Sequence, residues 1–247
     1  MTQHVNFLGK YIFEDIKTEN SLIYKKIRFT NLKEIFEMKK FGDSNKFGIQ
    51  YSFLENPFNE KGVFGESWGE FKLFINGSDI CEYLEEKESK TYIWNLYFII
   101  EWLCENLEFI LGYDDFPLPV KGENILELVD AANNFEIEDE LEEYLWHSAK
   151  SSWTFRHTWF SSRGGSVLVL AYFCRKNNDI EISWDSRLWI KNEIKFTNLI
   201  GTFLVEKEEF RKIVLEFLYD ILSSLKITTE DDIKQVREWT QKINLLN

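Results

Sequence analysis

Residues 92–111 read YIWNLYFIIEWLCENLEFIL, and this stretch is apolar on almost every side. Three acidic side chains interrupt it, Glu101, Glu105 and Glu108, and their spacing places them on one helical face. A membrane span needs about 20 residues with few or no charges, so these carboxylates argue against a span. We therefore expect a buried central helix with one solvated stripe, ending near Gly112.

The part of the chain before this helix has the periodicity of β-strands. Apolar and polar side chains alternate along residues 47–53 and 71–75, as in half-buried strands, and the pair Asn76-Gly77 supplies a turn. We expect strands in four segments, residues 7–13, 22–30, 47–53 and 71–75. They predict an N-terminal antiparallel β layer, interrupted by a short helix at residues 31–41 and a loop at residues 55–69.

The second half of the chain predicts helices and one β-hairpin. Residues 166–175 are almost continuously apolar, which is typical of a strand covered on both faces, and residues 179–185 alternate after a polar turn. We expect helices in four segments, residues 123–132, 138–148, 206–225 and 229–243. The last two carry apolar stripes and form a C-terminal helical pair. The fold class is therefore α+β, with residues 1–247 as one compact unit and residues 112–122 as its one candidate boundary.

The composition restricts the class of partner. The chain has 29 basic and 42 acidic residues and a net charge of −13, which disfavours nucleic acid and anionic membranes and fits binding to another protein. Three cysteines outside any CxxC motif are expected to be reduced: Cys81, Cys104 and Cys174. Because residues 1–10 lack a basic region followed by an apolar one, we expect a cytoplasmic protein.

The sequence lacks the common motifs of catalysis and cofactor binding. It contains no HExxH, CxxC pair, GxGxxG, GxxxxGK[ST] or GxSxG, the signatures of zinc peptidases, zinc fingers, dinucleotide sites, P-loops and hydrolase elbows. We therefore expect no cofactor, and the absence favours a non-catalytic protein. An enzyme whose residues are scattered along the chain stays open.

One polar cluster lies among aromatic residues just before the strand expected at residues 166–175. Arg156 and Arg163 can clamp an anion, with the backbone N–H groups of Gly164 and Gly165 as further donors, and His157 can carry a proton. These five residues form the predicted ligand-binding site. The alternative is structural: the Gly-Gly pair forms a turn, and Arg156 and His157 satisfy buried polar groups.

A second cluster alternates along residues 179–185. Asp179, Glu181 and Asp185 share one side of the strand with Ser183 and can hold Mg²⁺, as in a metal-dependent nuclease. In this alternative the catalytic residues are His157, Glu181 and Asp185. The more ordinary interpretation is a solvated strand face.

A third group lies in the helix expected at residues 138–148. Glu143 and His147 are four residues apart and share a helical face, with Asp139 and Glu140 nearby. One histidine with flexible carboxylates gives little support for a metal site, and we favour an exposed helix face.

Three stretches of the chain together carry a resemblance to a known family. They are WGEFKLFING at residues 68–77, YFIIEWLCENLEFIL at residues 97–111, and a third that holds the Arg156-His157 pair, the Gly164-Gly165 turn and the strand DIEISWD. Their order resembles the uncharacterised domain that precedes a zinc metallopeptidase of the ImmA/IrrE type in some larger bacterial proteins, over about residues 68–245. No HExxH is present, so peptidase activity does not carry over. The resemblance implies a sensing or regulatory module of a bacterial or mobile-element system.

These observations favour a non-catalytic protein-interaction or sensor module, bound to another protein through an acidic surface or aromatic faces. Two alternatives stay open: a metal-dependent nuclease or phosphotransferase, and a binder of small anionic ligands or nucleotides. A fourth hypothesis, mimicry of DNA, requires carboxylates in line along one face.

Overall fold

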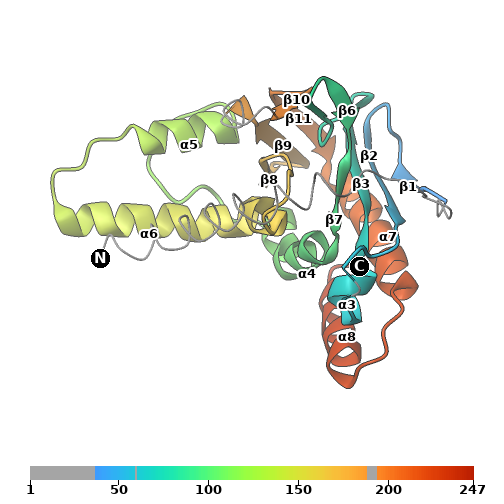
Figure 1. Cartoon of the computed structure of the whole chain (residues 1–247). Helices are drawn as coiled ribbons and strands as arrows, with labels where there is room; N and C mark the ends of the chain where they lie inside the picture. The colour runs from blue at the N-terminus through green and yellow to red at the C-terminus, as the bar shows by residue number, and fades with distance from the viewer. Residues whose placement is uncertain (1–36, 59, 188–193) are drawn as a thin grey trace.

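The computed structural model describes residues 37–58, 60–187 and 194–247. The strands expected at residues 7–13 and 22–30 lie outside the described residues, as do residues 31–36 of the expected helix. The predicted α+β class is confirmed: helices pack against antiparallel sheets (Figure 1). No helix in the described part of the chain is long and apolar enough to cross a membrane.

The N-terminal β layer is confirmed as an antiparallel sheet. Strands β1 (Lys39–Gly42), β2 (Phe47–Phe53) and β3 (Trp68–Ile75) follow one another, and β4 (Ser78–Asp79) and β7 (Tyr92–Asn95) both pair with β3. The turn after β3 is where the sequence places it, with Asn76 and Gly77 at φ of 50° and 81°. Glycine adopts such a φ without steric cost.

Three boundaries in this half of the chain were predicted wrongly. Residues 39–42 form β1 and no helix, because they pair with β2 in register from Lys39 opposite Tyr51. The expected loop contains a short helix, α3 (Gly62–Glu66), and ends where β3 begins at Trp68. Residues 92–95 form β7 against β3, so the central helix begins only at Tyr97. At β1, β3 and β7, pairing with another strand overrides the local pattern.

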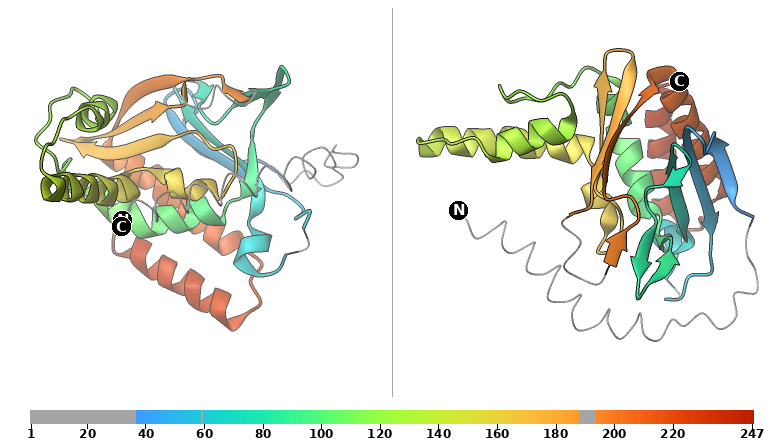
Figure 2. Two further views of the ribbon diagram at one scale, coloured as in Figure 1. Left: turned by 60° about the vertical axis from the view of Figure 1, so that its left-hand side comes forward. Right: turned by 90° about the horizontal axis from the view of Figure 1, so that it is seen from above.

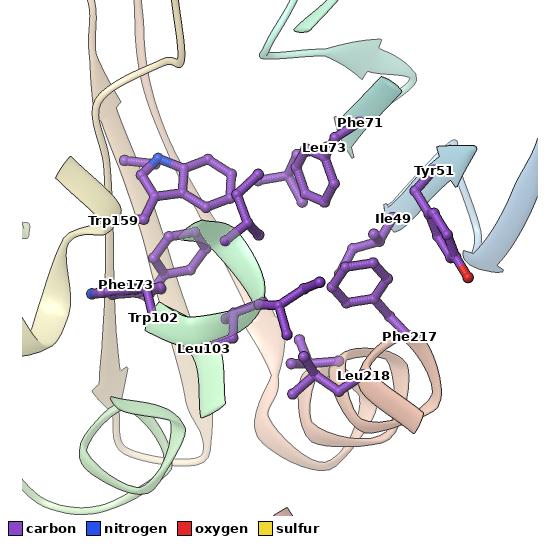
Figure 3. Packing of buried hydrophobic residues seen from close by; sticks show 14 of the residues in the cluster. Ile49, Tyr51, Phe71, Leu73, Trp102, Leu103, Trp159, Phe173, Phe217 and Leu218 are labelled. Carbon is purple, nitrogen blue, oxygen red and sulfur yellow. The ribbon is translucent and has the colours of Figure 1, made fainter. Parts of the chain in front are cut away.

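The central helix α4 (Tyr97–Leu111) is buried, as predicted. Its inner face holds Ile99, Leu103 and Leu107, all at most 4% exposed, while Glu105 and Glu108 face solvent. In Figure 3, Leu103 lies between aromatic residues from two sides of the core: Trp159 and Phe173 on one side, and Tyr51 and Phe217 on the other. Trp102 of the same helix lies beside Phe173. The helix therefore joins the two halves of the core.

The predicted β-hairpin belongs to a second antiparallel sheet. Strands β8 (Ala171–Lys176) and β9 (Asp179–Asp185) form the hairpin, and β11 (Ile200–Glu206) pairs with the other side of β9. Residues 166–170 lie outside the strand that was expected to include them. A small third sheet of β5 (Tyr83–Glu85), β6 (Glu88–Lys90) and β10 (Ile194–Phe196) was not foreseen.

The C-terminal helical pair is confirmed as α7 (Lys207–Ser224) and α8 (Glu230–Asn244). The Glu206 carboxylate accepts a hydrogen bond from the N–H of Glu209, and the Thr229 hydroxyl accepts one from the N–H of Asp232. Such side-chain caps satisfy N–H groups that have no partner inside a helix. Phe210, Phe217 and Leu218 of α7 are buried against the two larger sheets.

The remaining helices, α5 (Ile125–Asn133) and α6 (Glu140–His157), extend away from the sheets as a helical hairpin, which we call the arm (Figures 1 and 2). Helix α6 runs nine residues past its predicted end. Its last turns are held in place because Trp153 and His157 are buried against the second sheet. A 3₁₀ helix, η2 (Trp159–Arg163), then leads back to the core.

Candidate functional site

The Arg156-His157 pair is held by an acidic residue that the sequence did not single out. Arg156 donates from Nε to Oδ2 of Asp114 at 2.7 Å and from a terminal nitrogen to Oδ1 at 3.2 Å. Nε2 of His157 lies 3.0 Å from the same Oδ2, and Nδ1 lies 2.7 Å from the carbonyl oxygen of Phe173. Asp114 follows α4, so one carboxylate connects the end of α4 to the end of α6.

The polar groups of this cluster are engaged with one another, and its histidine is fully buried, while Arg156 and Asp114 stay 30% and 27% exposed. His157 is 0% exposed, and the ring of Trp153 stacks on it with 4.3 Å between centroids. The indole N–H of Trp153 donates to the carbonyl oxygen of Asp114 at 2.8 Å. Arg156 also lies over the ring of Phe109. Each polar group therefore has a partner inside the protein, which is the arrangement that the structural alternative describes.

The ionisation of the cluster follows from its burial. Burial lowers the pKa of His157 below its usual value, although the contacts with the Phe173 carbonyl and the Asp114 carboxylate act in the opposite direction. Burial also raises the pKa of Asp114, but hydrogen bonds from Arg156 and His157 outweigh it and hold that pKa below its usual range. A buried imidazole that resists protonation is poorly suited to exchange protons with a ligand.

Arg163 and the Gly-Gly pair do not join Arg156 and His157. Arg163 lies over the ring of Phe160, and burial lowers its pKa to about 10. Gly164 ends η2 with φ of 50°, and a Cβ there would lie 2.3 Å from the ring of Phe98. Glycine is required here for close packing against α4. The five residues of the predicted ligand-binding site thus contribute to two separate packing arrangements.

Glu181 is buried at 2% exposed, so the expected solvated strand face is wrong for the middle of β9. Its Oε1 accepts hydrogen bonds from the N–H of Ile125 and the hydroxyl of Ser183, both at 2.7 Å, and Lys176 lies 3.3 Å from Oε2. Ile125 is the first residue of α5, where the helix dipole favours a negative charge. The alternation put these side chains on one side of the strand, and α5 covers that side.

The carboxylates of β9 do not converge on a metal site. Asp185 pairs with Arg187 at 2.6 Å, and it lies at the opposite end of β9 from Asp179, a distance of about 20 Å along the strand. Within residues 37–58, 60–187 and 194–247, no group of three or more histidine, cysteine, aspartate or glutamate side chains is arranged to hold a metal ion. The pair of Glu143 and His147 on α6 is exposed, with 3.7 Å between Oε1 and Nε2.

The free end of the arm exposes large apolar side chains. Leu141, Tyr144 and Leu145 of α6 are 66%, 62% and 57% exposed, and Phe135 in the connection before α6 is 52% exposed. The three residues of α6 are spaced i, i+3 and i+4, so they share one helical face, which we call the arm tip. The other face of α6 contacts α5 and the connection: the Trp146 indole donates to the Ala132 carbonyl and stacks on Phe135.

The sequence that forms the arm tip is strongly acidic. No lysine or arginine occurs between residues 122 and 149. The exposed acidic residues around the tip are Glu136, Glu138, Asp139, Glu140, Glu142 and Glu143. Asp139 caps α6 through the N–H groups of Leu141 and Glu142, each at 3.0 Å, so the helix begins at a fixed residue. The sequence showed that three apolar residues at helical spacing share one face of this helix. It did not show whether that face is buried or exposed.

Comparison with protein-family models, curated proteins and solved structures finds no match to this chain. The resemblance to the domain that precedes ImmA/IrrE-type peptidases therefore stays a prediction.

Proposed function

We propose that this chain is a non-catalytic protein-interaction module that binds a basic protein through the arm tip. The observation that carries the proposal is the exposed helical face of Leu141, Tyr144 and Leu145. Single exposed apolar residues are ordinary on protein surfaces. A contiguous group with a polar rim is instead typical of an interaction site.

The charge around the tip supports a partner of defined chemistry. A surface rich in exposed carboxylates attracts a partner that carries lysine and arginine, and it accelerates their encounter. An apolar centre within a charged rim is the usual arrangement of a specific protein interface. The partner therefore presents an apolar cleft rimmed by basic side chains.

The same surface argues for a protein partner over the alternative of DNA mimicry. A mimic of DNA needs carboxylates that stand in for phosphates, and exposed leucine and tyrosine side chains contribute nothing to that likeness. In an interface with a protein cleft, large apolar and aromatic side chains supply most of the binding free energy.

Site-specific photo-crosslinking tests the proposal. A benzophenone amino acid is placed at Tyr144 in the arm tip, and at Tyr113, which is 73% exposed and lies outside the tip, as the matched control. In the native host, we expect one dominant crosslinked protein from position 144 and not from position 113. The crosslinked protein is then identified and purified.

The purified partner allows a quantitative test. Tyr144→Ser is expected to weaken its binding by on the order of 10- to 100-fold, as for a central interface residue. Glu142→Lys is expected to slow association because it reverses a charge in the rim. Equal crosslinking at both positions, or unchanged affinity in Tyr144→Ser, contradicts the proposal.

A further inference from the structure

A polar groove of about 750 Å³ lies between the first and third sheets, apart from the arm. Its floor includes Lys72 and Phe74 of β3, which alternate with the buried Phe71 and Leu73 and therefore face away from the core. Asp79 and Glu82 line one part of it, and Lys90 of β6 lines another. Small-molecule sites in proteins are typically about 300–1,000 Å³, so the groove has the size of a ligand site.

The walls of the groove are held in place by hydrogen bonds. Thr197 donates from its N–H and its hydroxyl to the carbonyl oxygen of Glu82, at 3.0 and 3.2 Å. The hydroxyl of Ser89 donates to the Glu82 carboxylate. These contacts tie the segment after β10 and strand β6 to one residue. A preformed groove loses little conformational freedom when a ligand binds.

The groove is lined by two lysines and two carboxyl groups, so neither sign of charge dominates its surface. Lys72 and Lys90 contribute two positive charges, and each ammonium is already engaged, with Glu70 at 2.9 Å and with Glu88 at 2.6 Å. Asp79 and Glu82 contribute two carboxyl groups. An anion would have to compete with glutamates for the ammonium groups, and a cation would meet two lysines. The lining therefore favours a ligand without net charge.

Asp79 supplies a polar atom for such a ligand. Its Oδ1 accepts from the N–H groups of Leu73 and Cys81, at 3.2 and 2.9 Å, and among the described residues no donor contacts Oδ2. Burial raises the pKa of Asp79 to about 7, although these two hydrogen bonds lower it. Near neutral pH this carboxyl both donates and accepts hydrogen bonds, and so does a hydroxyl group.

We infer that this groove binds an uncharged, hydroxyl-rich small molecule of the saccharide class. Hydroxyl groups of the ligand bond to Asp79 and the ring of Phe74 offers an apolar face for the C–H side of a sugar. The inference is independent of the arm tip, because no residue of the arm lines the groove.

The test uses saturation-transfer NMR on the purified chain. The probes are the neutral sugars glucose, galactose, N-acetylglucosamine and maltose, and two charged analogues of glucose, glucosamine and glucuronate. We expect at least one neutral sugar to bind with a dissociation constant on the order of 1 mM, and to bind more tightly than either charged analogue.

Variants place the binding in the groove. Asp79→Asn keeps an oxygen for Leu73 and Cys81 but replaces Oδ2 with a donor, and it is expected to weaken binding about tenfold. Phe74→Ala is the second variant, and the exposed Asp231→Asn on α8 is the control with unchanged binding. The inference is overturned if no neutral sugar binds, if glucosamine or glucuronate binds tightest, or if binding persists in both groove variants.

Discussion

The two ends of helix α6 differ in residue type and in exposure: polar residues are paired inside the fold at one end, and apolar residues face solvent at the other. At its C-terminal end, Arg156 and His157 have the chemistry of a catalytic site, but both are paired with Asp114, and His157 is buried against Trp153. At its N-terminal end, Leu141 and Leu145 have the character of core residues, but they face solvent. On α6, therefore, residue type identifies a functional surface only together with burial.

The strongest test of the C-terminal end is to remove its shared acceptor. Asp114→Ala leaves Arg156 and the buried His157 without their carboxylate, and we expect the free energy of unfolding to fall by about 2–3 kcal/mol. Asp115→Ala is the matched control. Asp115 is the exposed neighbour of Asp114 and has no such contacts, so its replacement should change the free energy of unfolding by no more than about 0.5 kcal/mol. Urea denaturation measures both. Equal stability of the two variants breaks the comparison.

A smaller loss is expected where α5 meets β9. Glu181→Ala leaves the Ile125 N–H and the Ser183 hydroxyl without their acceptor, and should reduce the free energy of unfolding by about 2 kcal/mol. The exposed Glu136→Ala serves as control. Thermal and urea unfolding report the difference. If Glu181→Ala is as stable as the control, the buried carboxylate does not hold the start of α5 against β9.

The pH dependence of stability sharpens the assignment of His157. Its folded-state pKa is lowered by burial, so below about pH 6.5 the unfolded chain takes up a proton that the folded chain resists. The contribution of His157 is therefore present above pH 6.5 and lost as the pH falls through its folded-state value. The pKa of Asp79 is raised to about 7, so its contribution to the free energy of unfolding decreases as the pH rises from about 4 to 7, which is opposite to that of His157.

Replacing His157 separates its contribution to the pH dependence of stability from that of Asp79. The difference in unfolding free energy between wild type and His157→Gln should shrink as the pH is lowered from about 7 to 5. His147→Gln, at the exposed histidine of the same helix, should show a nearly constant difference. A constant difference for His157→Gln as well would mean that its imidazole takes up protons freely.

The smallest effect on stability is expected at the arm tip. Leu145→Ser and Tyr144→Ser remove side chains that are 57% and 62% exposed, and each should change the free energy of unfolding by less than about 0.5 kcal/mol. Urea denaturation of the two variants checks this. A loss comparable to that of Asp114→Ala would place these residues in the core and remove the basis for an interaction surface.

Much of the fold was predictable from the sequence because its elements carry local signals: long apolar runs in α4 and β8, alternation in β9, and apolar stripes in the C-terminal helices. The short strands β5, β6 and β10 were missed, since three-residue strands have no period to detect. Strand β1 was mistaken for helix because its conformation depends on pairing with β2.

The candidate site was less predictable because its contacts join distant parts of the chain. Arg156 meets Asp114 across 42 residues, and Ile125 meets Glu181 across 56. Periodicity showed which side chains share a face on β9 and on α6. It could not show that α5 covers one of these faces and leaves the other exposed.

The affinity of the crosslinked partner for wild type, Tyr144→Ser and Arg156→Lys tests the central claim most directly. Calorimetry on folded, purified proteins should show the largest loss, on the order of 10- to 100-fold, for Tyr144→Ser. Arg156→Lys should bind as the wild type does, because Arg156 contacts Asp114 inside the protein. A loss of affinity in Arg156→Lys with none in Tyr144→Ser would show that the partner binds at the Arg156-His157 cluster and not at the arm tip.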